Sequence, residues 1–222
     1  MSRGIAVLRP EPGNCVTAAA IEARGGIAIR MPLFEVHPEP WILGHTEKFD
    51  ALILTSANAI RHGGPGLAAF RRLPVYAVGA PTAEAARQAG FDVACVGTDG
   101  AEALVARAGA ARIRSALHLA GRERMLEEGG IVAQVITVYA SEPIAPRDPA
   151  HLAGSVALVQ SARAGARLAE IVDAAGLARS GIALVAVSAR ATEAAGGGWE
   201  QRVVPDDVDS EALIDAAIAL AD

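Results

Sequence analysis

Aromatic residues, cysteine and excess positive charge are all scarce in this sequence. Aromatics make up 4% of the 222 residues and hydrophobic residues 52%, so the core must be built from Ala, Val, Leu and Ile. The formal net charge of −5 argues against non-specific binding to nucleic-acid phosphates, which depends on clustered Lys and Arg. We therefore expect a globular protein that does not bind nucleic acid.

Cysteine pairs and long apolar runs are also missing. Cys15 and Cys95 lie far apart and form no C-x-x-C pair, so neither a disulfide framework nor a zinc site is indicated. The apolar run before Arg9 is too short for a signal-peptide core, and no later run approaches the roughly 18 apolar residues of a membrane helix. These features favour a cytoplasmic protein without membrane contact.

Motifs for metal, nucleotide or hydrolytic chemistry are not found either. No G-x-S-x-G, Walker or G-x-G-x-x-G pattern occurs, and GGPG at 63–66 is interpreted as a flexible turn. The histidines are scattered without metal-ligand spacing, at His37, His45, His62, His118 and His151. We expect neither a metal nor a cofactor.

What the sequence does contain is a series of short, almost continuously apolar runs, which are typical of strands buried on both faces. They lie at 4–8, 51–55, 75–79, 116–120, 156–160 and 183–187. Ala-rich stretches with helical spacing lie between most of them, for instance 82–89 and 211–220. This alternation predicts an α/β fold with parallel sheets covered by helices on both sides.

The chain also contains an internal repeat. Each half has an apolar strand that ends in a small hydroxyl residue, and Ser56 and Ser161 are 105 residues apart. The matching segments are LILTSANAI at 52–60 with ALVQSARAG at 157–165, YAVGAPTAEAA at 76–86 with LVAVSARATEAA at 184–195, GTDGAEAL at 97–104 with DVDSEAL at 207–213, and IAVLRPE at 5–11 with LHLAGRE at 117–123. The repeat predicts two similar parallel-sheet α/β domains of flavodoxin-like, duplicated type.

Two extended segments, at 29–40 and 134–146, alternate apolar and polar residues and then reach prolines, which suits exposed strands. Their equivalent positions predict two crossings between the domains. The first domain would hold 1–34 plus 142–222 and the second 38–136, with a two-stranded linker at about 33–38 and 136–142.

Over nearly its whole length the chain resembles the uroporphyrinogen-III synthases. The likeness rests on the order and spacing of several weak motifs. They are a strand ending in Arg9-Pro10, a linker with Pro32, FDALILTSANAI at 49–60, YAVGAPTAEAA at 76–86, Val138-Tyr139, the VQS strand at 159–161, and the closing segments at 183–195 and 203–217. The chain departs from many relatives at 188–192, where SARAT replaces a turn containing glycine and threonine.

The resemblance implies a cofactor-independent monomeric lyase of tetrapyrrole biosynthesis. Its substrate would be hydroxymethylbilane, a linear tetrapyrrole polycarboxylate, closed in the cleft between two domains with loss of water and inversion of the last ring. Hydroxymethylbilane synthase would be a further partner. By motif, Thr55, Ser56 and Thr82 would line one wall and Ser161 the other, and Tyr139 would project from the second linker toward the reacting end.

The residues themselves point to the same edges. In open α/β sheets ligands bind beyond the carboxyl ends of the strands, and Ser56, Ser161 and Ser188 lie at such ends. Helix capping is the alternative role for these hydroxyls, and the two roles are compatible. Guanidinium groups at strand ends could bind carboxylates or simply face solvent, and they belong to Arg9, Arg122, Arg163 and Arg190.

Tyr139 is one of only two tyrosines, and its hydroxyl could donate a hydrogen bond to a departing hydroxyl. A linker aromatic that packs between domains is the alternative. Asp99 followed by Glu102 predicts a capping box. Two other functions stay open at this point, which are a two-domain binding protein or sensor for an anionic metabolite, and a nucleotide-dependent enzyme on a flavodoxin-like fold.

Overall fold

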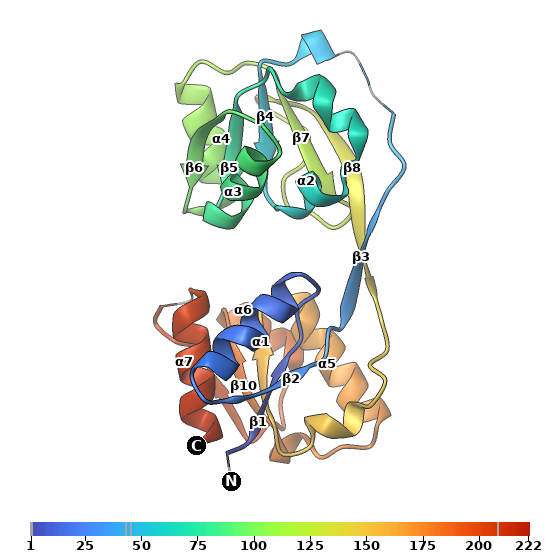
Figure 1. Cartoon of the computed structure of the whole chain (residues 1–222), viewed down its shortest axis with the longest axis vertical. Helices are drawn as coiled ribbons and strands as arrows, with labels where there is room; N and C mark the ends of the chain where they lie inside the picture. Colours follow the sequence, from blue (N-terminus) through green and yellow to red (C-terminus); the bar gives the residue numbers. More distant parts are fainter. Residues whose placement is uncertain (1, 43, 45, 208) are drawn as a thin grey trace. The chain divides into compact units, whose positions relative to one another are not determined.

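The structure, a computed structural model, describes residues 2–42, 44, 46–207 and 209–222. The chain divides into two compact units, each with one sheet. Unit 1 holds Met1–Glu35 and Glu142–Asp222, and unit 2 holds Val36–Ser141. Figure 1 labels most of the helices and strands of both.

Unit 1 is built on a five-stranded sheet in the order β11-β10-β9-β1-β2, in which every neighbouring pair is parallel. Its strands are β1 (Gly4–Val7), β2 (Ile27–Arg30), β9 (Val156–Val159), β10 (Ala183–Ala186) and β11 (Gln201–Val203). Its helices are α1 (Gly13–Ala23), α5 (Ala162–Ala174), α6 (Ala189–Ala195) and α7 (Ser210–Ala221), with short 3-10 turns η3 (Pro149–Leu152) and η4 (Arg179–Gly181).

Unit 2 carries a six-stranded sheet in the order β3-β8-β7-β4-β5-β6. Its strands are β3 (Phe34–Pro38), β4 (Ala51–Leu54), β5 (Val75–Val78), β6 (Val93–Gly97), β7 (Ala116–Gly121) and β8 (Val132–Pro143). Its helices are α2 (Asn58–His62), α3 (Ala80–Gln88) and α4 (Gly100–Ala110), with 3-10 turns η1 (Thr46–Lys48) and η2 (Pro65–Phe70). The pairs β8–β7, β7–β4, β4–β5 and β5–β6 are parallel.

The two sheets have the same topology. Reading unit 1 as β2-β1-β9-β10-β11 and unit 2 as β8-β7-β4-β5-β6 places β1 with β7, β9 with β4 and β10 with β5, which are the strands matched in the sequence repeat. Unit 2 adds β3 at its edge. The expected α/β fold with two similar parallel sheets is confirmed.

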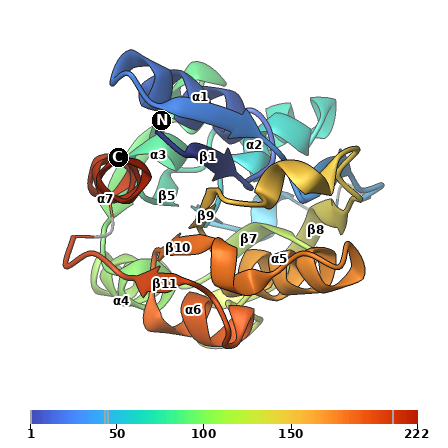
Figure 2. The same ribbon diagram turned by 90° about the horizontal axis from the view of Figure 1, so that it is seen from below.

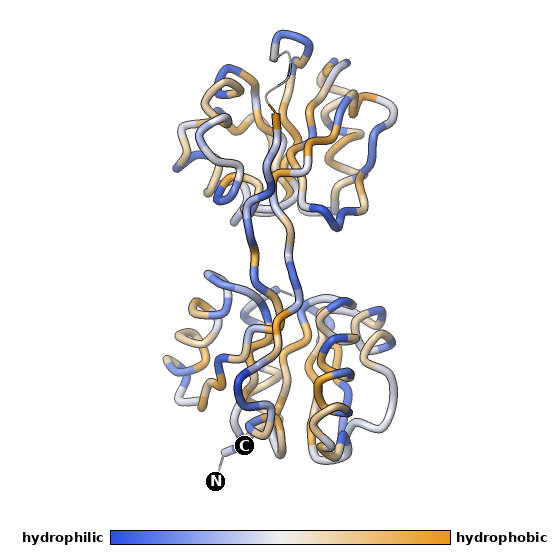
Figure 3. The backbone as a smooth tube through the Cα atoms, turned by 90° about the vertical axis from the view of Figure 1, so that its right-hand side faces the viewer, coloured by the Kyte–Doolittle hydropathy of each residue, from blue (hydrophilic) through white to orange (hydrophobic). Residues whose placement is uncertain are grey.

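Helices cover both faces of each sheet, because the central strands are apolar on both sides. In unit 1, α5 and α6 pack on one face and α1 and α7 on the other, as Figure 2 shows. In unit 2, α2, η2 and α3 cover one face, and α4 covers the other. Figure 3 colours the backbone by hydropathy and shows hydrophobic stretches inside each unit. No helix of the described residues is long and apolar enough to cross a membrane.

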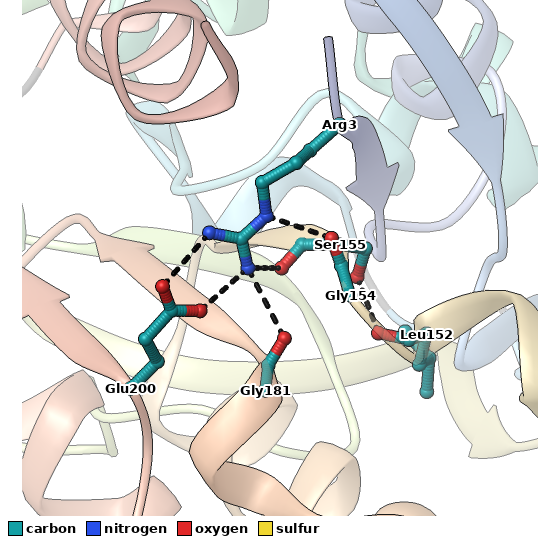
Figure 4. A network of polar contacts seen from close by, with 6 residues as sticks. All are labelled: Arg3, Leu152, Gly154, Ser155, Gly181 and Glu200. Atoms are coloured by element: carbon teal, nitrogen blue, oxygen red, sulfur yellow. Dashed lines mark hydrogen bonds and ion pairs between the residues drawn. The ribbon is translucent and has the colours of Figure 1, made fainter. Parts of the chain in front are cut away.

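Arg3 ties together the amino ends of the unit 1 strands (Figure 4). Its guanidinium donates to the carbonyls of Gly154 at 2.7 Å, Ser155 at 3.0 Å and Gly181 at 3.1 Å, and pairs with Glu200 at 2.7 Å. These partners precede β9, β10 and β11. The network lies at the end of the sheet opposite to the carboxyl ends, so its role is structural.

Two expectations differ from the structure. The segment from 134 is not an exposed strand over its whole length, because Ile136, Val138 and Ala140 are buried and β8 stays paired with β7 as far as Tyr139. The capping box also fails. The side chain of Asp99 accepts no hydrogen bond from the helix backbone and instead binds Arg107 at 2.8 Å.

Candidate functional site

The carboxyl ends of β1, β9 and β10 lie side by side in unit 1, because these strands are neighbours in one parallel sheet. This brings Arg9, Ser161 and Ser188 to one edge, with Arg163 and Arg190 in the first turns of the helices that follow. We call this set of five residues the unit 1 edge. It lies where ligands bind in open α/β sheets.

Both serines of this edge cap helices. Ser161 Oγ accepts from the backbone N–H of Ala164 at 3.0 Å, and Ser188 Oγ accepts from that of Ala191 at 3.2 Å. Capping therefore takes place at α5 and α6, and it leaves each hydroxyl hydrogen free to donate to a ligand.

The arginines of the unit 1 edge differ in their surroundings. The Arg163 guanidinium lies 4.5 Å from the centre of the Phe34 ring, a cation–π distance. Arg190 is exposed and forms no ion pair with any described residue. Arg190 is thus available to a carboxylate at little cost in existing contacts.

The turn between β1 and α1 fixes the position of Arg9. Asn14 is fully buried and donates to the carbonyls of Val7 at 2.7 Å and Arg9 at 3.1 Å. A Cβ at Gly13 would overlap the Arg9 guanidinium, so this side chain lies back over the start of α1. The sequence did not single out Gly13 or Asn14, since both act through contacts that only folding creates.

Arg30 ends β2, beside this turn, and was also not singled out. It pairs with Glu11, and this hydrogen bond raises the pKa of Arg30. The pKa of Glu11 is lowered by the backbone N–H of Cys15 and by Arg30. Glu11 therefore neutralises Arg30, a cation near the unit 1 edge, by an ion pair.

The carboxyl ends of β8, β7, β4 and β5 form the corresponding edge of unit 2. Four residues, Thr55, Ser56, Thr82 and Arg122, follow these ends, and Tyr139 lies within β8, opposite the last residue of β7. We call these five residues the unit 2 edge. Ser56 Oγ accepts from the backbone N–H of Asn58 at 3.2 Å, which shapes the turn before α2. Thr82 is only 5% exposed, inside the first turn of α3, so it offers a ligand little surface.

Tyr139 lies across the end of β7. Its cross-strand partner is Gly121, and a Cβ at Gly121 would lie 2.6 Å from Cζ and 2.9 Å from Oη of the tyrosine. The next residue, Arg122, donates its backbone N–H to the Tyr139 carbonyl at 2.9 Å. The ring centroid of His62 is 6.3 Å from that of Tyr139. The ring of Tyr139 thus packs directly against the backbone of Gly121 at the carboxyl end of β7.

A hollow of 290 Å³ lies beside His62, the neighbour of Tyr139. It is lined by Pro38, Glu39, Pro40, Trp41, His62, Gly63, Gly64, Pro65 and Gly66. Glu39 pairs with Arg122. Burial lowers the pKa of His62, and the nearby Arg61 acts in the same direction. Glu39 and His62 were missed because neither lies directly at the end of a central strand.

The GGPG turn has a packing role. Trp41 Nε1 donates to the Gly63 carbonyl at 2.9 Å, and a Cβ at Gly66 would lie 2.8 Å from the Trp41 ring. The turn therefore packs tightly against Trp41 and holds this side chain in the wall of the hollow.

Thr55 has a partner inside the sheet. Its Oγ1 lies 3.2 Å from Nε2 of His118, which is fully buried in β7. Burial lowers the pKa of His118 to about 4, so the imidazole is neutral at pH 7. The sequence signal for His118 was one polar residue inside an otherwise apolar strand.

Among the residues that the structure describes, no group of three or more His, Cys, Asp or Glu side chains is placed to hold a metal ion. His45 lies outside the described residues. The chemistry that the two edges offer consists of hydroxyl donors, a phenol and guanidinium groups. Guanidinium and hydroxyl groups of this kind can donate hydrogen bonds to carboxylates.

Comparison with known proteins bears on the same point. The family model described as Uroporphyrinogen-III synthase HemD matches residues 16–215. No curated protein matches the chain in sequence.

Two solved structures are similar over nearly their whole length. Uroporphyrinogen-III synthetase from Helicobacter pylori has a TM-score of 0.65 at 18% identity, covering 99% of this chain and 100% of that one. A mutant uroporphyrinogen III synthase from Thermus thermophilus has a TM-score of 0.55 at 16% identity, covering 99% of each. These likenesses show the fold, and because the family model spans most of the sequence, the chain belongs to the uroporphyrinogen-III synthase family.

Proposed function

We propose that this chain is a lyase that closes hydroxymethylbilane to uroporphyrinogen III, with loss of water and inversion of the last pyrrole ring. The observation that carries the proposal is the family match over residues 16–215. The alternative of a non-catalytic binding protein or sensor is not favoured, because the matching family is one of enzymes. A nucleotide-dependent enzyme has no support from either comparison.

Tyr139 is proposed as the residue that acts at the reacting end. Its O–H would donate to the terminal hydroxyl of the substrate as the C–O bond breaks and water leaves. Its place at the carboxyl edge of the sheet, seated on Gly121, supports this role, because a donor must be held in a fixed direction to act.

The arginines are proposed to bind carboxylates of the substrate. Arg9, Arg163 and Arg190 would do so from the unit 1 edge and Arg122 from the unit 2 edge, with the hydroxyls of Thr55, Ser56, Ser161 and Ser188 as further donors. Guanidinium groups suit this task because they can form two parallel hydrogen bonds to one carboxylate. Thr82 would contribute least, since it is nearly buried.

We further infer that the enzyme works as a cytoplasmic monomer without metal or cofactor, on substrate supplied by hydroxymethylbilane synthase. The two units are proposed to be independent domains, joined near residues 33–38 and 136–142. Holding the ends of a reactive linear substrate in one geometry is work for a shaped binding surface, which fits the lack of strong catalytic motifs.

The experiment is incubation of the purified chain with hydroxymethylbilane, with separation of the ring isomers formed. The inverted isomer should be produced in excess over a protein-free control, and a chelator should not change its rate. Formation of only the unrearranged ring would refute the proposed function. Loss of activity with a chelator and its return with added metal would refute the cofactor-free mechanism.

A further inference from the structure

His118 is a buried polar residue in a strand that is otherwise apolar. Its exposed fraction is 0%, and β7 is buried along its whole length. Its cross-strand neighbours are Ile53 on β4 and Val135 on β8, both apolar. A polar group at such a position carries a desolvation cost that an aliphatic side chain would not.

The fold itself does not require a histidine here. In the sequence repeat, His118 aligns with Ala6 of β1, which is also fully buried in the matching strand of unit 1. Its hydrogen-bond partner Thr55 aligns with Gln160. The same topology is therefore built without an imidazole, which leaves the hydrogen bond to Thr55 as the feature specific to unit 2.

The strand register explains how the two side chains meet. Ile53 is paired with His118, so Thr55 follows on the same face, two residues nearer the carboxyl edge. The imidazole reaches diagonally along the sheet, and its Nε2 lies 3.2 Å from Thr55 Oγ1. His118 thus links the interior of the sheet with a half-buried hydroxyl at its edge.

The protonation state of His118 decides whether the Thr55 hydroxyl can donate a hydrogen bond to a ligand. Burial keeps His118 neutral at pH 7, and the nearby Arg124 acts in the same direction. The Leu126 carbonyl and Glu127 act against this, yet Nδ1 has no hydrogen-bond partner among the described residues. The Thr55 contact fits either tautomer, and we assign the proton to Nε2, which lets the imidazole donate to Oγ1; a proton on Nδ1 would instead make Nε2 accept from the hydroxyl.

We propose that His118 is a positioning residue, whose Nε2–H donates to Thr55 Oγ1 and so directs the Thr55 O–H toward a carboxylate of the substrate. The inference rests on the proposed function, because it concerns binding of that polycarboxylate. His118 itself does not touch substrate. It fixes the direction in which one hydroxyl donates.

The first test is a double-mutant cycle with His118→Leu and Thr55→Val, in which KM and kcat for closure of hydroxymethylbilane are measured. His118→Leu should raise KM about threefold to tenfold with little change in kcat, as expected for one hydrogen bond of substrate binding. In the Thr55→Val background, His118→Leu should change KM no further. His118→Gln, which keeps an N–H donor, should restore part of the loss.

Ile53→Val is the matched control. It removes one buried methylene group beside His118 without touching the hydrogen bond, so it should lower the melting temperature and leave KM unchanged. A purely structural role for His118 would be revealed if His118→Leu lowered stability and left KM at the wild-type value. An equal rise in KM with and without Thr55 would also overturn the proposal.

The second test needs no activity. Nitrogen-15 NMR of labelled histidine should show a neutral His118 protonated on Nε2 at pH 7, and Thr55→Val should shift that Nε2 signal. Protonation on Nδ1 would overturn the proposal. Failure of the wild-type chain to form the inverted isomer would instead refute the proposed function, and the NMR result would still decide the hydrogen bond.

Discussion

Gly121→Ala should impair the proposed enzyme by moving Tyr139. A Cβ at Gly121 would lie 2.6 Å from Cζ of the tyrosine, so the ring has to retreat by roughly 0.8 Å to reach ordinary contact at 3.4 Å. Gly121 does not have a positive φ, so alanine is compatible with its backbone. The substitution therefore displaces the phenol while leaving every atom of Tyr139 present.

A misplacement of about 1 Å can lower the rate of a positioned reaction by about 100-fold, and we expect a loss of that order in formation of the inverted isomer. Overpacking costs about 1–3 kcal/mol in a closed core, and the half-buried ring should keep the cost near the lower limit. The assay is single-turnover closure of hydroxymethylbilane, with isomer separation, alongside thermal unfolding.

The control is Gly121→Ala made in a Tyr139→Ala variant. Because this variant lacks the aromatic ring, the added methyl group has nothing to displace. In that background the substitution should have no further effect on the rate. If Gly121→Ala left the wild-type rate intact, the seat of Tyr139 on Gly121 would have no part in catalysis. If its effect persisted without the ring, the cause would lie elsewhere in β7.

Three further outcomes are expected. Tyr139→Phe removes the proposed donor and should slow formation of the inverted isomer by about 10²–10⁴-fold while the melting temperature changes little; a wild-type rate would exclude the donor role. Gly13→Ala should displace the Arg9 guanidinium and raise KM about 10-fold with unchanged or higher helix stability, and an unchanged KM would remove Arg9 from substrate binding. Because burial lowers the pKa of His118 from 6.5 to about 4, the unfolded chain binds the proton more readily, so stability is full above pH 6.5 and falls as the pH approaches 4. Urea unfolding should show a loss of about 3 kcal/mol from this group between pH 7 and pH 4, which His118→Leu should abolish.

Much of the fold could be predicted from the sequence because the strands are buried on both faces. The runs at 51–55 and 156–160 are apolar without interruption, which is how buried parallel strands appear, and they form β4 and β9. The repeat then fixed the same order of strands in both units. The pairing of β8 with β7 as far as Tyr139 could not be predicted, because alternation alone does not show whether a partner strand is present.

The candidate site was predictable only as far as topology determines it. Ser161 and Ser188 follow apolar strands, so their place at a sheet edge follows from the sequence. Gly121 under Tyr139, and His118 beside Thr55, arise from cross-strand register between distant segments, and no local pattern encodes that register. Asp99 shows the converse, because its local capping signal was overridden by an ion pair with Arg107.

The ratio of the two ring isomers shows whether this chain directs ring closure with inversion. Hydroxymethylbilane is incubated with increasing amounts of the purified chain, and the isomers are separated after complete conversion. If the chain is the proposed enzyme, the inverted isomer rises with protein concentration until it is nearly the sole product. A ratio that stays at the protein-free value at every concentration would refute a role of this chain in ring inversion.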